Sequence, residues 1–126
     1  MASVGVIGGG QLARMMTPPA INLGLEIKVL AEAAGSSAAL ATTQVGDYTH
    51  LDVVREFAAT VDVITFDHEH VPLPVLEALE AEGVRVNPPS KSLAFAQNKL
   101  KMRKRLGDLG LPMPAWAEIQ DAHALQ

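Results

Sequence analysis

The stretch "VIGGGQLARMM", Val6 to Met16, decides the fold class of this chain. A short apolar run over residues 4–7 stops at three consecutive glycines, and apolar residues then recur every three to four positions, as on a helix. The pattern predicts a strand, a tight turn and a helix. Gly8, Gly10 and Ala13 also match the spacing G-x-G-x-x-G/A, which permits close approach of the backbone to a phosphate. The motif alone is weak evidence, because glycines can simply turn a strand into a helix.

Apolar runs of strand length alternate with helical segments along the rest of the chain. Further strands are predicted at residues 27–30, 44–47, 61–66 and 84–86, and further helices at 52–60, 74–82, 90–96 and 98–109. The nearly unbroken run 61–66 indicates the most buried strand. Because parallel neighbours need crossovers and helices must cover the sheet, we expect an α/β fold: a doubly wound parallel sheet of about five strands with helices on both faces.

Proline and glycine predict where helices change or end. Pro18 and Pro19 cannot both lie in an unbroken hydrogen-bond ladder, so the first helix is expected to bend or restart near Thr17. Gly24 and Gly83 are expected to end helices, and Gly110 is expected to cap the last one.

Composition excludes several classes of function. The 126 residues include no cysteine, which rules out disulfides, thiolate nucleophiles and Cys-ligated metals. The net charge is −4, and basic residues cluster only between Lys91 and Arg105, so no nucleic-acid partner is expected. The N-terminus does not resemble a signal peptide, and no apolar run reaches the roughly 18 residues of a membrane span. We therefore expect a cytoplasmic protein without a membrane partner.

Two loops are predicted at the carboxyl ends of strands, where sheets of this class bind ligands: residues 8–11 and 67–70. A dinucleotide would also need an acidic residue after the second strand, for which Glu32 is the candidate. An NAD-binding module therefore remains an alternative, as does an interaction domain that has lost its ligand. His68, Glu69 and His70 carry ligand types for metals, but neither cysteine nor further clustered histidines support them, so no metal site is expected.

Three stretches taken together resemble a known family. "GGGQLARM", "VITFDHEHVP" and "GVRVNPPSKSLAFAQNKLKMRKRLGDLGLPMPAW", in this order, resemble the N-terminal region of the N5-carboxyaminoimidazole ribonucleotide synthetases, ATP-grasp enzymes of purine biosynthesis. The resemblance implies a Rossmann-like pre-ATP-grasp domain over residues 1–110. It also implies a linker and the start of an ATP-grasp domain over 111–126. The reaction implied joins bicarbonate to the amine of 5-aminoimidazole ribonucleotide, using ATP and Mg²⁺, in a homodimer.

The resemblance also assigns residues to this reaction. It places Gly10, Gln11 and Leu12, at a helix N-terminus, together with Asp67 and Glu69, on the ribonucleotide, and Lys99 on ATP. Asp67 replaces a glutamate that is usual in the family, and Asn98 replaces the commoner aspartate. No catalytic residue and no metal ligand is expected among these residues. We therefore expect the 126-residue chain alone to be inactive.

Overall fold

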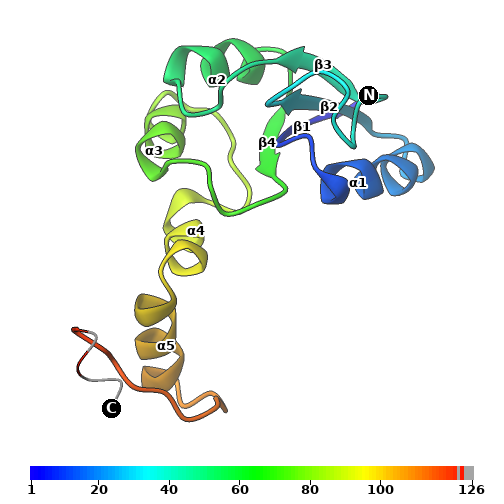
Figure 1. The fold of residues 1–126 in the computed structure, drawn as a ribbon. Coiled ribbons are helices and arrows are strands. Elements are labelled where there is room, and N and C mark those ends of the chain that lie inside the picture. The colour runs from blue at the N-terminus through cyan, green and yellow to red at the C-terminus, as the bar shows by residue number, and fades with distance from the viewer. Residues whose placement is uncertain (122, 124–126) are drawn as a thin grey trace.

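A parallel sheet forms the centre of the computed structural model, which describes residues 1–121 and 123 (Figure 1). Its strands are β1 (Ser3–Ile7), β2 (Glu26–Ala31), β3 (Thr42–Val45) and β4 (Val63–Phe66), in the order β3-β2-β1-β4. Val6 of β1 lies opposite Val29 of β2 and Thr65 of β4. The second and third strands extend the sheet on one side of β1 and β4 extends it on the other. The carboxyl ends of β1 and β4 therefore form the switch point at which such sheets bind ligands.

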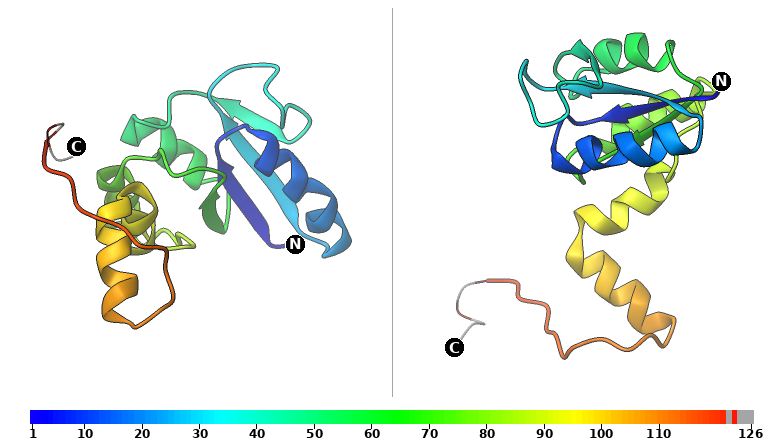
Figure 2. Two further views of the ribbon diagram at one scale, coloured as in Figure 1. Left: turned by 60° about the horizontal axis from the view of Figure 1, so that its bottom comes forward. Right: turned by 90° about the vertical axis from the view of Figure 1, so that its right-hand side faces the viewer.

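Helices cover both faces of the sheet, as predicted. α1 (Gln11–Asn22) packs on one face, and α2 (Leu51–Ala58) and α3 (Leu73–Ala81) cover the other (Figure 2). Successive residues of a strand point to opposite faces, so Val6 contributes to the core under α1 and Ile7 to the core under α2 and α3. The α1 side is lined largely by alanine, and the other side by larger side chains. The sheet can thus approach α1 closely.

The observed strands differ from the prediction in two respects. The expected fifth strand at 84–86 is reduced to a single bridge between Val86 and Ile64, with hydrogen bonds of 2.8 and 2.9 Å on either side. Pro88, which has no N–H, follows too closely for a longer ladder. The expectation that residues 61–66 form the most buried strand is also wrong. In β1 every residue but Val4 is buried, whereas in β4 only Ile64 is buried. β4 is less covered because it is the edge strand of the sheet.

Of the bend or restart predicted near Thr17, the restart is wrong. α1 runs without interruption from Gln11 to Asn22, with Pro18 and Pro19 inside it. The carbonyl groups that lose their partners belong to Arg14 and Met15, and both residues and both prolines are exposed. Water can bond to those carbonyls, so the two missing donors cost less than they would on a buried face. The helix ends predicted at Gly24, Gly83 and Gly110 are confirmed.

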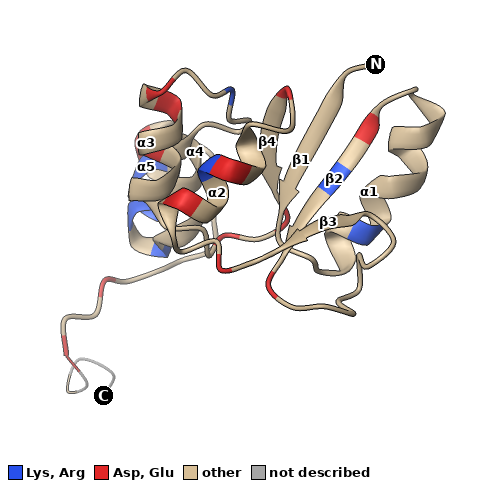
Figure 3. Ribbon diagram, turned by 90° about the horizontal axis from the view of Figure 1, so that it is seen from above, with Lys and Arg blue, Asp and Glu red and all other residues tan. Residues whose placement is uncertain are grey.

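Two consecutive helices, α4 (Ser90–Gln97) and α5 (Lys99–Asp108), lead away from the sheet (Figure 1). Asn98 between them has extended backbone angles (φ −130°, ψ 98°), and its side chain accepts a 2.9 Å hydrogen bond from Lys101 N–H, which caps α5. Lysine and arginine are concentrated on α5 (Figure 3). The following segment returns along α5, where Glu118 forms a 2.8 Å ion pair with Lys104. No helix in the described part of the chain is long and apolar enough to cross a membrane.

Candidate functional site

The glycine turn at the end of β1 is tightly enclosed. Gly8 has φ +107°, a conformation that L side chains rarely adopt, and its N–H donates to Leu30 O at 2.9 Å. A Cβ placed on Gly8 would collide with the carboxylate of Asp67 and lie 2.9 Å from His68 Cδ2. Glycine at this position therefore lets the loop after β4 approach the turn.

Two carboxylates bind the next two amides of the turn. Gly9 N–H donates to Glu32 Oε2 at 3.1 Å, and Gly10 N–H donates to Asp67 Oδ2 at 2.9 Å. Glu32 follows β2 and Asp67 follows β4, so the turn is held from both neighbouring strands. The Asp67 side chain is only 4% exposed, and its Oδ1 has no hydrogen-bond partner among the described residues.

The N-terminus of α1 presents unused donors beside these carboxylates. Arg14 N–H donates to Gly10 O at 3.2 Å and is the first amide to bond within the helix, and Gly10 provides no side-chain cap. The N–H groups of Gln11, Leu12 and Ala13 consequently have no intrahelical acceptor. Such donors and the helix dipole favour an acceptor or an anionic group from a ligand.

The surroundings of Glu32 favour its ionised form. Burial raises the pKa of the Glu32 carboxyl, but hydrogen bonds from its own N–H and from Gly9 N–H, together with the nearby His68 ring, outweigh burial, so the pKa falls below its ordinary value. Burial, followed by the negative charges of Glu32, Asp47 and Asp67, raises the pKa of the Tyr48 phenol above its ordinary value. Tyr48 therefore stays protonated and can donate to an acceptor.

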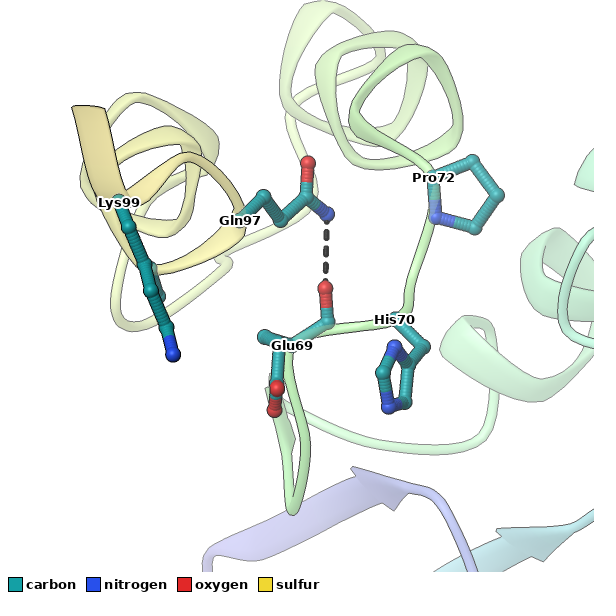
Figure 4. A pocket seen from close by; sticks show the side chains of 6 residues that line it. Glu69, His70, Pro72, Gln97 and Lys99 are labelled. Carbon is teal, nitrogen blue, oxygen red and sulfur yellow. Dashed lines mark hydrogen bonds between the residues drawn. The ribbon is translucent and has the colours of Figure 1, made fainter. Parts of the chain in front are cut away.

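A pocket of about 560 Å³ lies between the loop after β4 and the α4–α5 junction (Figure 4). This polar pocket is lined by Glu69, His70, Pro72, Ala96, Gln97 and Lys99. The side-chain amide of Gln97 donates to Glu69 O at 2.9 Å and to Val71 O at 2.7 Å. Gln97 thus fixes the loop to the end of α4, next to the residue that begins α5.

The residues assigned by resemblance separate into two groups. Gly10 N–H donates a hydrogen bond to Asp67 at the glycine turn. Gln11 and Leu12 are exposed at the start of α1. Glu69 and Lys99 line the polar pocket instead. Asp67 and Glu69 therefore face different sites.

Sequence reasoning did not assign the roles that the structure gives to three residues. The sequence indicates Glu32 only as a candidate ribose ligand, whereas its carboxylate holds the glycine turn. It offers His68 only as a candidate metal ligand, and it gives no signal for Gln97. Their contacts join loops distant in sequence, and no local pattern indicates such contacts. No cluster of three or more potential metal ligands is present among residues 1–121 and 123.

Residues 1–97 match the family model of the ribonucleotide synthetase preATP-grasp domain. The chain is also 48% identical over 120 residues to an N5-carboxyaminoimidazole ribonucleotide synthase of Mycobacterium tuberculosis, which covers 94% of this chain and 28% of that protein. It is 45% identical over 124 residues to the synthase of Corynebacterium ammoniagenes, with 97% and 30% covered. The chain thus spans less than a third of the length of these relatives.

Solved structures give the same result. The N5-carboxyaminoimidazole ribonucleotide synthetase of Thermotoga maritima superposes with a TM-score of 0.85 at 29% identity, covering 98% of this chain and 35% of that chain. The Aspergillus clavatus synthase, in complex with ADP and 5-aminoimidazole ribonucleotide, gives a TM-score of 0.79 at 34% identity, covering 90% and 31%. These similarities confirm the resemblance found in the sequence.

Proposed function

This chain belongs to the ribonucleotide synthetase preATP-grasp domain family, and on this premise we propose that it is the ribonucleotide-binding N-terminal part of an N5-carboxyaminoimidazole ribonucleotide synthetase. The proposed substrate of this part is 5-aminoimidazole ribonucleotide. The observation that carries the proposal is the group of unused first-turn donors of α1 beside the buried carboxylate of Asp67, at the β1/β4 switch point.

The chemistry of the turn matches a ribonucleotide. The N–H groups of Gln11 and Leu12 can donate to acceptor atoms of the ligand, and the Asp67 carboxylate beside them favours a hydroxyl or amine of the ligand on that side. The Gln11 side chain, which is exposed, offers both a donor and an acceptor. Gly10 lets the backbone come close, because a Cβ there would lie 2.6 Å from Asp67 Oδ2.

For ATP, we propose the polar pocket that contains Lys99. The Lys99 ammonium can neutralise phosphate charge, and the pocket adjoins the loop that carries the ribonucleotide ligands. The two hydrogen bonds of Gln97 hold the loop after β4 against the end of α4, close to Lys99. The two substrates would then meet across the loop formed by residues 67–71.

We propose that the complete reaction requires the part of the synthetases that this chain does not cover. We propose that it forms a C–N bond between bicarbonate and the amine of the ribonucleotide, with ATP converted to ADP and phosphate. We further propose that the Mg²⁺ ligands lie in the part of the synthetases that this chain does not cover, that the domain boundary lies near Gly110, and that the protein is a cytoplasmic homodimer.

The alternative is an NAD-binding module, and Glu32 provides its one specific support. Glu32 follows β2, where dinucleotide-binding domains place the acid that binds ribose. In this structure the carboxylate accepts a hydrogen bond from Gly9 N–H, and Asp67 adds a second negative charge beside the turn. Both features oppose a pyrophosphate at this position.

Ligand-induced stabilisation separates these functions. Melting of the 126-residue chain is measured with 5-aminoimidazole ribonucleotide, with ATP and with NAD, since a ligand that binds only the folded state stabilises it by about 2.7 kcal/mol at 100 times its dissociation constant. We expect stabilisation by the ribonucleotide and none by NAD. Stabilisation by NAD alone would replace the proposal with the alternative.

A further inference from the structure

His68 is a largely buried histidine that the proposed function leaves without a role. It lies in the loop after β4, and its side chain is 19% exposed. The ring centroids of Tyr48 and His70 lie 5.0 and 5.3 Å from that of His68. The charged groups that face it are Glu32, from the end of β2, and its neighbour Asp67.

The two ring nitrogens of His68 have different partners. Nδ1 accepts a 3.1 Å hydrogen bond from His70 N–H, and a nitrogen that accepts carries no proton. The neutral ring therefore has its proton on Nε2. Nε2 is buried and forms no hydrogen bond with a described residue, but it lies 3.3 Å from Glu32 Oε1 and 3.7 Å from Asp67 Oδ1.

These acceptors are the carboxylates that hold the glycine turn through Gly9 and Gly10. Two carboxylates that approach the same place repel each other unless a donor lies between them. His68 Nε2 is the nitrogen that lies beside both carboxylates, and a small rotation of the ring would let its N–H donate to them. Glu32 and Asp67 can then lie close together while each keeps its bond to the turn.

We propose that His68, as the neutral Nε2–H tautomer, is the positioning residue of the glycine turn. It holds Glu32 and Asp67 against the Gly9 and Gly10 amides and so orients the first-turn donors of α1. The consequence for ligand binding rests on the proposed function, but the positioning role itself does not require a ligand.

The first test is NMR spectroscopy of the 126-residue chain without ligand. The ¹⁵N shifts of the His68 ring should show an unprotonated Nδ1 and a protonated Nε2. A ring protonated on Nδ1 would overturn the proposal. This measurement needs no variant and does not depend on how a substitution folds.

The second test uses three substitutions at position 68. His68→Gln keeps a donor near the place of Nε2, His68→Asn keeps only an acceptor near the place of Nδ1, and His68→Phe keeps neither. The Gly9 and Gly10 amide protons should retain their hydrogen-bonded shifts in the Gln variant. They should lose about tenfold in exchange protection in the Asn and Phe variants. Unchanged protection in His68→Phe, or rescue by Asn and not by Gln, would refute the role.

Ribonucleotide affinity gives a separate readout. His68→Gln should keep the dissociation constant of 5-aminoimidazole ribonucleotide within about twofold, and His68→Phe should raise it about tenfold. His50→Gln is the matched control, because the His50 side chain is exposed and lines neither proposed binding site. If the wild-type chain does not bind the ribonucleotide, the proposed function fails, and the NMR tests still decide the role of His68.

Discussion

Replacement of Gly8 by alanine tests how tightly the loop after β4 is tied to the glycine turn. The new Cβ would overlap the Asp67 carboxylate and lie 2.8 Å from its Cγ, a separation that real Cβ atoms essentially never show. Asp67 would have to move and give up its 2.9 Å bond from Gly10 N–H. Gly24→Ala is the matched control. Gly24 also has a positive φ (+68°), but no atom lies within 4 Å of the position of its Cβ.

The expected magnitude follows from these contacts. Each substitution forces alanine into a conformation that costs about 1 kcal/mol. Only Gly8→Ala also loses a hydrogen bond to a buried charged group, worth about 1.5 to 3 kcal/mol. Gly8→Ala should therefore lower the free energy of unfolding by about 2 kcal/mol more than Gly24→Ala does. With a urea dependence of about 2 kcal/mol/M, the midpoints of the two variants should differ by about 1 M.

Urea unfolding of the 126-residue chain and both variants, followed by circular dichroism, measures this difference. Equal midpoints for the two variants would show that Asp67 is not held against the turn, and the described geometry of the site would then be wrong.

Three further predictions concern the site and the chain as a whole. In the complete synthetase, Asp67→Asn should raise the KM for 5-aminoimidazole ribonucleotide about tenfold. A hydrogen bond to a charged acceptor is stronger than one to an amide by about 1.4 kcal/mol. An equal rise in the KM for ATP would remove Asp67 from the ribonucleotide site. Folding lowers the pKa of Glu32, so wild type should be more stable than Glu32→Gln above pH 4.5. This difference in stability should disappear as the pH falls through the lower, folded-state pKa of Glu32. A difference that persists at pH 2, measured by thermal melts across the acid range, would contradict this prediction. The 126-residue chain alone should show no ribonucleotide-dependent ADP release with bicarbonate and Mg²⁺, since phosphoryl transfer depends on metal and cationic charge around the phosphates; turnover of about 1 per second or more would mean that the active site has been misplaced.

The order of strands and helices could be predicted because it follows from local patterns. The apolar run before Gly8 and the spacing of apolar residues after Gly10 are sufficient for the strand, turn and helix at the N-terminus. Helix ends at glycine are equally local. The position of α1 across Pro18 and Pro19 was not predictable in this way, because the cost of a missing donor depends on whether water reaches the freed carbonyl.

The arrangement of the candidate site was only partly predictable. The switch-point rule brings the loops after β1 and β4 together, and it correctly places Gly10 near Asp67. It does not indicate that Glu32 would bind Gly9, 23 positions away, or that His68 would lie between two carboxylates. Those contacts depend on the conformations of loops that follow three different strands.

A single non-helical residue separates α4 from α5. Asn98 is the only non-helical position between the two helices, so rotation about its two backbone dihedrals would swing α5 and the segment beyond it as one lever. The ten residues of α5 make that lever about 15 Å long, and a turn of 10° would displace its far end by roughly 3 Å. Lys99 is the first residue beyond Asn98 and would lie at the pivot of this rotation. Its ammonium could therefore keep its place in the polar pocket while everything that follows α5 is reoriented.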